Sequence, residues 1–329
     1  MLRRVLYITV SLAFFAPATA LADGGPSPGV IEAGPGVADN TIRYVTLSAG
    51  KATTLESIQT DGGQVNGSRN YRGSWGIPLV TFSGQTGGLS PNLTTLVLGQ
   101  TGSGSCSAGT CSALRRTTRF QIVNPDTLRP RKTVTLKGDF AFDALSPDGH
   151  VLYLIQHKDL SHYLVRAYDL GRNLLRPGAI ADRTQRGWIM EGSPMSRAVS
   201  KGGRFVYTLY QNPGGYPFVH ELDTVRGVAH CIGLPLAQNQ GLLQKLELTP
   251  GSGGRTLAVY TQQGRPYFTV DTRTYEVSRP RPVQVAPQHH GFPWWWLSLG
   301  AVPLLAAALL ARRSWLVPVM PALRRRAPA

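Results

Sequence analysis

A turn motif that returns four times predicts an all-β fold, a β-propeller of about five four-stranded blades, followed by one C-terminal transmembrane helix. Ser146-Pro147-Asp148-Gly149 leads into the apolar run 151–155, and Ser200 to Gly203 leads into the apolar run 205–210. Weaker copies start at Ser90 and Thr249, so the four Ser/Thr positions are 56, 54 and 49 residues apart. A self-similarity of about 40–50 residues built from short strands is typical of propeller blades.

An Asp residue recurs at a nearly constant distance after the turn motif. Asp169 and Asp223 each lie 23 residues after their Ser, and Asp271 lies 22 residues after Thr249. In the best copy the inner strand ends at Ser146, and three further strands are expected over 151–156, 163–169 and 174–180. Asp-Gly and Gly-Gly supply the positive φ of tight hairpins, and no stretch between 40 and 286 shows a helical period.

The first copy carries an insertion over about 99–116, because its marker Asn124 lies 34 residues after Ser90. Upstream, 43–47 and 53–58 read as two strands without the preceding pair of a blade, and we expect them to be the N-terminal part of a closing blade shared by both chain ends. The 249 residues of 39–287 give about five blades at about 50 residues each. Two packed sheets, the alternative, would not require a repeated turn at constant spacing.

The two ends of the chain read as targeting and membrane segments. Residues 1–22, with a charged start, an apolar run and Ala20-Leu21-Ala22, have the layout of a secretory signal peptide. Residues 23–38, rich in Gly and Pro, are expected to be a flexible leader to the extracytoplasmic propeller, 39–287. Residues 292–311 are 20 residues without a charge and fit one membrane span. Residues 312–329 carry five Arg and form a basic cytoplasmic tail, which places the propeller outside the plasma membrane.

The predicted extracytoplasmic location is oxidising, so the three cysteines can form disulfides. Cys106 and Cys111 lie in one Gly/Ser-rich loop and are candidates for a disulfide that closes a small ring, the alternative being two free thiols. Cys231 lies in an apolar strand and is expected to be a buried small hydrophobe.

The charge balance favours an anionic partner. The chain has a formal net charge of +16, and without Arg3, Arg4 and the five tail arginines 27 basic residues remain against 18 acidic ones. A basic outer domain is attracted to anionic envelope polymers and to headgroups. Nucleic acid is a poor choice of partner on the outer face of a membrane. The alternative is that scattered Arg simply keeps the surface solvated.

Residues that carry chemistry are few. No nucleophile elbow, His-Glu-x-x-His helix or phosphate loop is present, and His157 with His162 lacks a third metal ligand at motif spacing, so no metal or cofactor is predicted. The repeated Asp169, Asp223 and Asp271 are expected to cap hairpins. Recognition is instead expected where the repeat is broken, and the candidate recognition residues are Arg183, Arg186, Trp188 and Tyr216. Trp188 packed onto a blade is the alternative.

The Leu-Ser-Pro-Asp-Gly turn with Tyr153-Leu154-Ile155, and Val270-Asp271-Thr272-Arg273-Thr274, resemble the YVTN-type and WD-type propeller repeats of secreted bacterial proteins. Segments 166–170 and 217–224 resemble uncharacterised actinobacterial propellers with one membrane anchor. The resemblance covers about 40–285 and implies blades without a transferable active site. Lys201-Gly202 and Asn92-Leu93 depart from Pro-Asp and Asp-Gly, which predicts altered geometry in those two turns.

Two functions follow from these observations. The first is a non-enzymatic, membrane-anchored extracytoplasmic scaffold or sensor that binds a protein or an anionic envelope component. The alternative is a lyase or hydrolase of envelope glycans with its site in the propeller channel. The enzyme requires non-repeating Asp, Glu or His that converge at the channel mouth.

Overall fold

The computed structural model describes residues 42–49, 51–101, 114–184, 189–212, 215–236 and 240–279, together with the backbone of four short strands. The chain divides into two compact units, Met1–Pro280 and Arg281–Ala329, and every described residue lies in the first. The predicted signal peptide, membrane span and basic tail therefore lie outside the described residues. Within the described part, no helix has the length and apolarity needed to cross a membrane.

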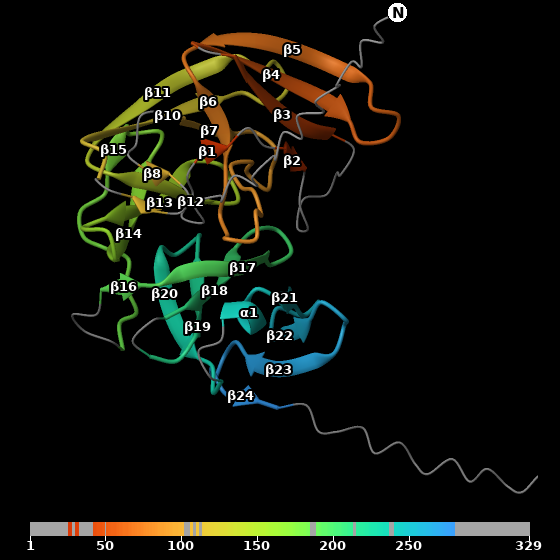
Figure 1. Cartoon of the computed structure of the whole chain (residues 1–329), viewed down its shortest axis with the longest axis vertical. Helices are drawn as coiled ribbons and strands as arrows, with labels where there is room; N and C mark the ends of the chain where they lie inside the picture. Colours follow the sequence, from red (N-terminus) through yellow and green to blue (C-terminus); the bar gives the residue numbers. More distant parts are fainter. Residues whose placement is uncertain are drawn as a thin grey trace, which may run out of the picture. The chain divides into compact units, whose positions relative to one another are not determined.

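The described chain folds into successive antiparallel sheets (Figure 1). The first sheet contains β2 (Val30–Glu32), β3 (Ile42–Ala49), β4 (Ala52–Gln59) and β5 (Val65–Arg72). The second contains β1 (Pro26–Ser27), β6 (Trp75–Pro78), β7 (Leu96–Gln100), β10 (Thr117–Val123) and β11 (Pro130–Lys137). The third contains β12 (Phe140–Leu145), β13 (Val151–His157), β14 (His162–Asp169), β15 (Leu174–Leu175) and β16 (Met190–Glu191).

Two further sheets complete the series. The fourth contains β17 (Ser193–Val199), β18 (Phe205–Gln211), β19 (Phe218–Asp223) and β20 (Val228–Gly233). The fifth contains β21 (Leu246–Pro250), β22 (Thr256–Thr261), β23 (Pro266–Asp271) and β24 (Val277–Ser278). One helical turn, α1 (Gln240–Leu243), joins them, although the sequence shows no helical period there. The prediction of a nearly all-β fold is confirmed, and the first, fourth and fifth sheets have the predicted four strands, whereas the second and third have five.

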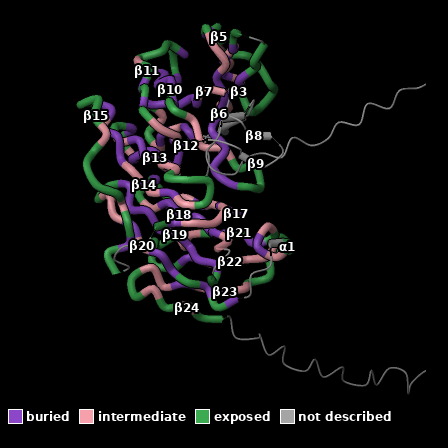
Figure 2. Tube along the Cα trace, turned by 60° about the vertical axis from the view of Figure 1, so that its left-hand side comes forward, coloured by how far each residue is buried: buried purple, intermediate pink, exposed green. Residues whose placement is uncertain are grey.

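The buried core lies between consecutive sheets (Figure 2). Leu55 of the first sheet packs with Ile77 and Leu98 of the second. Phe120 of the second packs with Leu152 of the third, and Leu209 of the fourth packs with Leu257 of the fifth. Each sheet therefore buries a face against the next in chain order, which is how propeller blades pack.

The repeated turns share two backbone hydrogen bonds. The backbone N–H groups of Ser90, Ser146 and Ser200 donate to the carbonyl oxygens five residues on, at 2.9, 2.9 and 2.8 Å. In the fifth sheet the same bond runs from Gly251 to Thr256, at 2.8 Å. The prediction that Thr249 is the fourth equivalent is therefore wrong by two residues, because Pro250 pairs with Leu257 as Leu145 pairs with Leu152.

The expectation of altered turns is wrong for Asn92-Leu93 and confirmed for Lys201-Gly202, where Gly202 has a φ of 80° while the equivalent Asn92, Asp148 and Gly253 have no positive φ. The third residue after each repeat position has a positive φ, which is 58° at Leu93, 71° at Gly149, 79° at Gly203 and 63° at Gly254. Its N–H donates back to the carbonyl of the repeat position in all four copies. Leu93 thus adopts the glycine conformation, because the two hydrogen bonds that close the turn require it.

The N-terminal region differs most from expectation. Strands β1 and β2 lie inside the segment 23–38 that was predicted as a flexible leader, and they pair with β6 and β3. With β2 in place, the first sheet has four consecutive N-terminal strands, and none of the described strands from the C-terminal end joins it, contrary to the predicted shared blade. Strands β2 and β5 thus cover the two edges that β3 and β4 alone would leave open.

Candidate functional site

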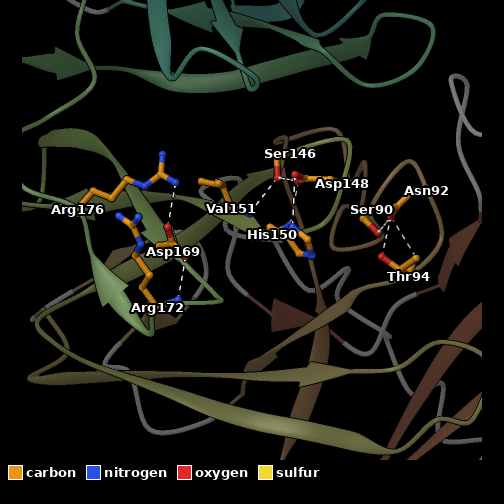
Figure 3. A network of polar contacts seen from close by, with 10 residues as sticks. All are labelled: Ser90, Asn92, Thr94, Ser146, Asp148, His150, Val151, Asp169, Arg172 and Arg176. Atoms are coloured by element: carbon orange, nitrogen blue, oxygen red, sulfur yellow. Dashed lines mark hydrogen bonds and ion pairs between the residues drawn. The ribbon is translucent and has the colours of Figure 1, made fainter.

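The Asp residues that recur with the blades are structural caps, as predicted. Asp169 Oδ1 accepts from the N–H of Arg172, Asp223 Oδ1 from Val225 and Arg226, and Asp271 Oδ1 from Arg273 and Thr274. Figure 3 shows the Asp169 cap near the Ser146 and Ser90 turns, where Asp148 and Asn92 accept the hydrogen bonds. These carboxylates stabilise hairpins and are engaged by backbone donors.

The predicted recognition residues fall on one stretch of chain and one hairpin. Arg183 is exposed, directly after Asp182, whose carboxylate accepts the Cys231 N–H at 2.8 Å. That contact fastens the long connection to β20 of the fourth sheet. Tyr216 is 71% exposed in the hairpin between β18 and β19. Arg186 and Trp188 lie outside the described residues, so their recognition role stays a prediction.

The insertion of the second sheet contains a small hairpin. Strands β8 (Cys106–Ser107) and β9 (Thr110–Cys111) pair in antiparallel register, with Cys106 opposite Cys111. Their side chains are outside the description, and the disulfide stays a prediction. Cys231, by contrast, is buried as expected, 3.6 Å from Nδ1 of His220, and burial raises the pKa of its thiol.

A hairpin of the second sheet reaches across to the fourth. This crossing hairpin, residues 79–86, is closed by a hydrogen bond from Val80 N–H to the Gln85 carbonyl. Its Phe82 N–H donates to the Pro194 carbonyl at 2.7 Å. The Gln85 amide accepts from Arg197 N–H at 2.7 Å and donates to the Arg197 carbonyl at 3.1 Å. The crossing hairpin thus satisfies the free backbone edge of β17 as a neighbouring strand would.

A buried ion pair lies beside this contact. Arg197 Nη2 is 2.6 Å from Oδ1 of Asp143, and the two side chains are 8% and 5% exposed. Asp143 occupies the bulge in the β12–β13 register, which turns its side chain out of the regular alternation toward the fourth sheet. In the same row of β17–β20, Arg197 pairs with Thr208, Thr208 with His220 and His220 with Cys231. Burial lowers the pKa of His220 to about 4, so the ring is neutral at neutral pH.

A basic groove lies on the second sheet. It has a volume of about 280 Å³ and is lined by Gln100, Leu114, Arg115, Arg116, Thr117, Thr118 and Arg119. Arg116 and Arg119 are exposed, and Lys137 stands exposed opposite Thr117 in the neighbouring strand. Among the residues that the structure describes, no ion pair involves these three cations.

The third arginine of the basic groove is held in place. Arg115 Nε and Nη2 lie 2.9 and 2.8 Å from Oδ1 of Asp139, and the Arg115 N–H donates to Oδ2 at 3.0 Å. Burial acts to raise the pKa of Asp139, but hydrogen bonds from His157 and Arg115 and the Arg115 charge outweigh it and hold the pKa well below its ordinary value. Arg115 is therefore neutralised, and Arg116, Arg119 and Lys137 carry the net charge.

The sequence predictions missed this groove, although a signal is present. Residues 115–137 contain seven basic residues and one acidic residue, Asp126. Only the register of β10 and β11 shows that Arg119 and Lys137 belong to one exposed face, because alternate residues of a strand point to the same side.

A second groove, here called the central groove, lies between β17, β21 and the tip of the crossing hairpin. Its volume is about 390 Å³. Of its described lining residues, Glu247 is the one carboxylate and the paired Arg197 the one basic residue. Within the described residues no three His, Cys, Asp or Glu side chains lie together as metal ligands would.

No known protein family matches the chain, and no curated protein matches its sequence. Among solved structures, hydrazine synthase of Kuenenia stuttgartiensis is 12% identical with a TM-score of 0.43, covering 82% of this chain and 69% of that one. TolB of Acinetobacter baumannii is 14% identical with a TM-score of 0.41, covering 76% and 56%. The β-propeller domain of Cps50 (Swd1) of Myceliophteria thermophila is 10% identical with a TM-score of 0.42, covering 82% and 71%. Likeness of this degree carries nothing about ligand or activity.

Proposed function

We propose that the chain is a non-enzymatic binding protein whose basic groove binds an anionic polymer of the cell envelope. The observation that carries the proposal is that Arg116 and Arg119 line one groove and that Lys137 shares the exposed strand face of Arg119, while none of the three has a carboxylate partner among the described residues. Like charges gathered on one side of a sheet repel each other, and a polyanion with repeated charges relieves that repulsion. An Arg guanidinium can also bind two oxygens of one phosphate or carboxylate group at once.

The setting of this groove is part of the proposal. We place the domain outside the plasma membrane, behind a signal peptide and on a single C-terminal span, and we take the sheets to be the blades of a propeller of about five. The apolar segment 292–311 with Arg312 and Arg313 after it supports this topology. Protease treatment of intact cells checks it: the domain should be degraded while an epitope on the tail stays protected.

The central groove supports binding better than glycan hydrolysis. Glycoside hydrolysis ordinarily needs two carboxylates that flank the scissile bond. The described lining of the central groove has Glu247 alone, and the nearby Asp143 is held by Arg197. We therefore favour binding over a lyase or hydrolase.

Binding of the purified full-length chain to polyphosphate, to poly-L-glutamate and to phosphatidylglycerol vesicles tests the proposal. The double variant Arg116→Gln/Arg119→Gln should lose about tenfold or more in affinity for the soluble polyanions, and its affinity should depend less steeply on salt because fewer counterions are released. The control is Arg255→Gln/Arg265→Gln, two exposed arginines of the fifth sheet, which removes the same charge elsewhere.

An equal loss in both double variants would show that net charge alone attracts the polymer, and the basic groove would be excluded as a site. Binding to vesicles but to neither soluble polymer would assign the face to the membrane surface instead.

A further inference from the structure

The central groove contains a buried polar group without a hydrogen-bond partner, and the proposed polyanion site at the basic groove does not account for it. Ser196, on β17, is 7% exposed and lines the groove, yet its Oγ has no hydrogen-bond partner. A buried hydroxyl without a partner is destabilising by about 1–3 kcal/mol. Such a group calls for an explanation, and a bound molecule that supplies the missing partner would provide one in this groove.

The rest of the lining is rich in groups that both donate and accept hydrogen bonds. Besides Ser196, the central groove is lined by Ser83, Gln85, Gln244, Thr249 and Gln262. Gln85 is already oriented, because its amide bridges the N–H and the carbonyl of Arg197. Ala198, Val199, Leu246 and Leu248 add apolar surface between these polar groups.

The groove is close to electrically neutral. Among the described lining residues, Arg197 is the only basic one and is paired with Asp143, so Glu247 contributes the one uncompensated charge. A neutral ligand with many hydroxyl groups matches this lining, because each hydroxyl donates and accepts, as Ser and Gln side chains do. Its carbon-bound hydrogens would meet the apolar side chains. The volume of about 390 Å³ lies in the range of ligand-binding clefts.

We propose that the central groove binds a neutral saccharide, with Ser196 Oγ, Gln244 and Gln262 as its hydrogen-bonding groups. This site is separate from the basic groove of the second sheet and takes a ligand of different charge. An extended peptide is the competing occupant, and it would bind through backbone hydrogen bonds instead of these side chains.

Saturation-transfer NMR on the purified full-length chain tests this inference. The probes are maltotriose, cellotriose, mannotriose and triacetylchitotriose, with a neutral Gly/Ser/Gln heptapeptide as the competing ligand. We expect saturation transfer to at least one trisaccharide and none to the peptide. Ser196→Ala should lower the affinity for that trisaccharide about two- to tenfold, as expected for one hydrogen bond.

Ser196→Ala also separates binding from folding. Because the Oγ has no partner in the free protein, its removal should leave the melting temperature unchanged or higher. Gln262→Ala should weaken binding in the same way, and Gln59→Ala, an exposed glutamine of the first sheet, is the matched control and should not. No transfer to any trisaccharide, equal affinity in Ser196→Ala, or preferential binding of the peptide would overturn the proposal. The polyanion assay on Arg116 and Arg119 is unaffected by any of these results.

Discussion

Several turns of this domain hold a residue other than glycine in the left-handed backbone conformation, which is strained for such residues. In the described part of the chain, four residues other than glycine have positive φ: Leu93, Leu128, Asn173 and Tyr275. Three of them lie four residues after a capping Asn or Asp, at Asn124, Asp169 and Asp271, and Gly227 holds the same place after Asp223. The position needs the left-handed region whatever side chain is there.

Replacing Leu93 by Gly should therefore stabilise the fold. A left-handed conformation costs an L-residue about 1–2 kcal/mol, and the greater chain entropy of Gly offsets part of the gain. We expect Leu93→Gly to raise the free energy of unfolding by up to about 1 kcal/mol in urea titration. Tyr275→Gly is the contrasting variant and should destabilise, because the Tyr275 ring stacks on His230 with 3.7 Å between centroids. A loss of stability in Leu93→Gly would contradict the strain argument.

The buried Glu221 predicts a pH dependence. Burial, reinforced by the charge of Asp223, raises its pKa to about 7. A carboxyl with a raised folded-state pKa favours the folded state fully below its unfolded pKa of about 4.5, and this contribution is lost as the pH rises through about 7.

Glu221→Gln should remove that loss. Relative to the parent chain, the variant should gain stability between about pH 4.5 and 7 and keep the gain above pH 7, by at most roughly 3 kcal/mol at about 1.4 kcal/mol per pKa unit. Urea titrations of both chains at pH 4.5, 6 and 8 measure the difference. A constant difference across the three pH values would show that Glu221 does not titrate in this window.

At the scale of elements, the repeated turns are also contacts between sheets. A Cβ placed on Gly203 would lie 2.1 Å from Cγ of Pro91, and a Cβ on Gly149 would lie 2.6 Å from Oγ1 of Thr95. The turns that contain Gly149 in the third sheet and Gly203 in the fourth therefore both pack against the Ser90 turn of the second sheet. The glycines serve two purposes there, a positive φ and a close approach.

The pair Gly203→Ala and Gly202→Ala separates these two purposes. Both glycines have φ near +80°, but a Cβ on Gly202 meets nothing within 4 Å. Gly202→Ala should cost only the conformational strain, about 1 kcal/mol, and Gly203→Ala should cost at least about 2 kcal/mol because Pro91 must move as well. Chemical denaturation of the two variants gives the comparison, and equal losses would mean that the two turns do not touch.

The crossing hairpin can be tested at its own contact. Gln85→Ala removes both side-chain hydrogen bonds to the Arg197 backbone. We expect the Arg197 amide to exchange with solvent about tenfold faster or more, while amides in the middle of β13 keep their protection. Unchanged exchange at Arg197 would show that the backbone bond from Phe82 to Pro194 suffices to cover this edge.

At the scale of the whole molecule, the Asp143–Arg197 pair joins the third and fourth sheets. Removing one partner leaves the other charge buried, and Asp143→Ala should cost about 3–5 kcal/mol. The double variant Asp143→Leu/Arg197→Met should lose less than the single one, because it buries no unpaired charge. Differential scanning calorimetry of the parent and both variants measures this. A double variant less stable than the single one would indicate that the pair contributes more than it costs to desolvate.

The local features of this fold were predictable and the non-local ones were not. The hairpin turns and Asx caps follow from a few neighbouring residues, so the positions of Ser146, Asp169 and Asp223 could be assigned from the sequence. The contact of Gln85 with Arg197 spans 112 residues, and that of Asp143 with Arg197 spans 54. No periodicity encodes such pairs, since they depend on how whole sheets are placed. Thr249 resembles the other repeat positions in residue type only, because the strand register makes Gly251 the equivalent of Ser146.

The first and last sheets are each built from consecutive strands, and this bears on how the domain would respond to tension. No described strand of the C-terminal sheet is hydrogen-bonded to a strand of the N-terminal one. The described strands therefore provide no ladder of backbone bonds that joins the first sheet to the last, and a pull on the two ends of the domain can separate these two sheets without breaking one. Force spectroscopy should show extension in several steps of about fifty residues, as one blade after another comes away from its neighbour.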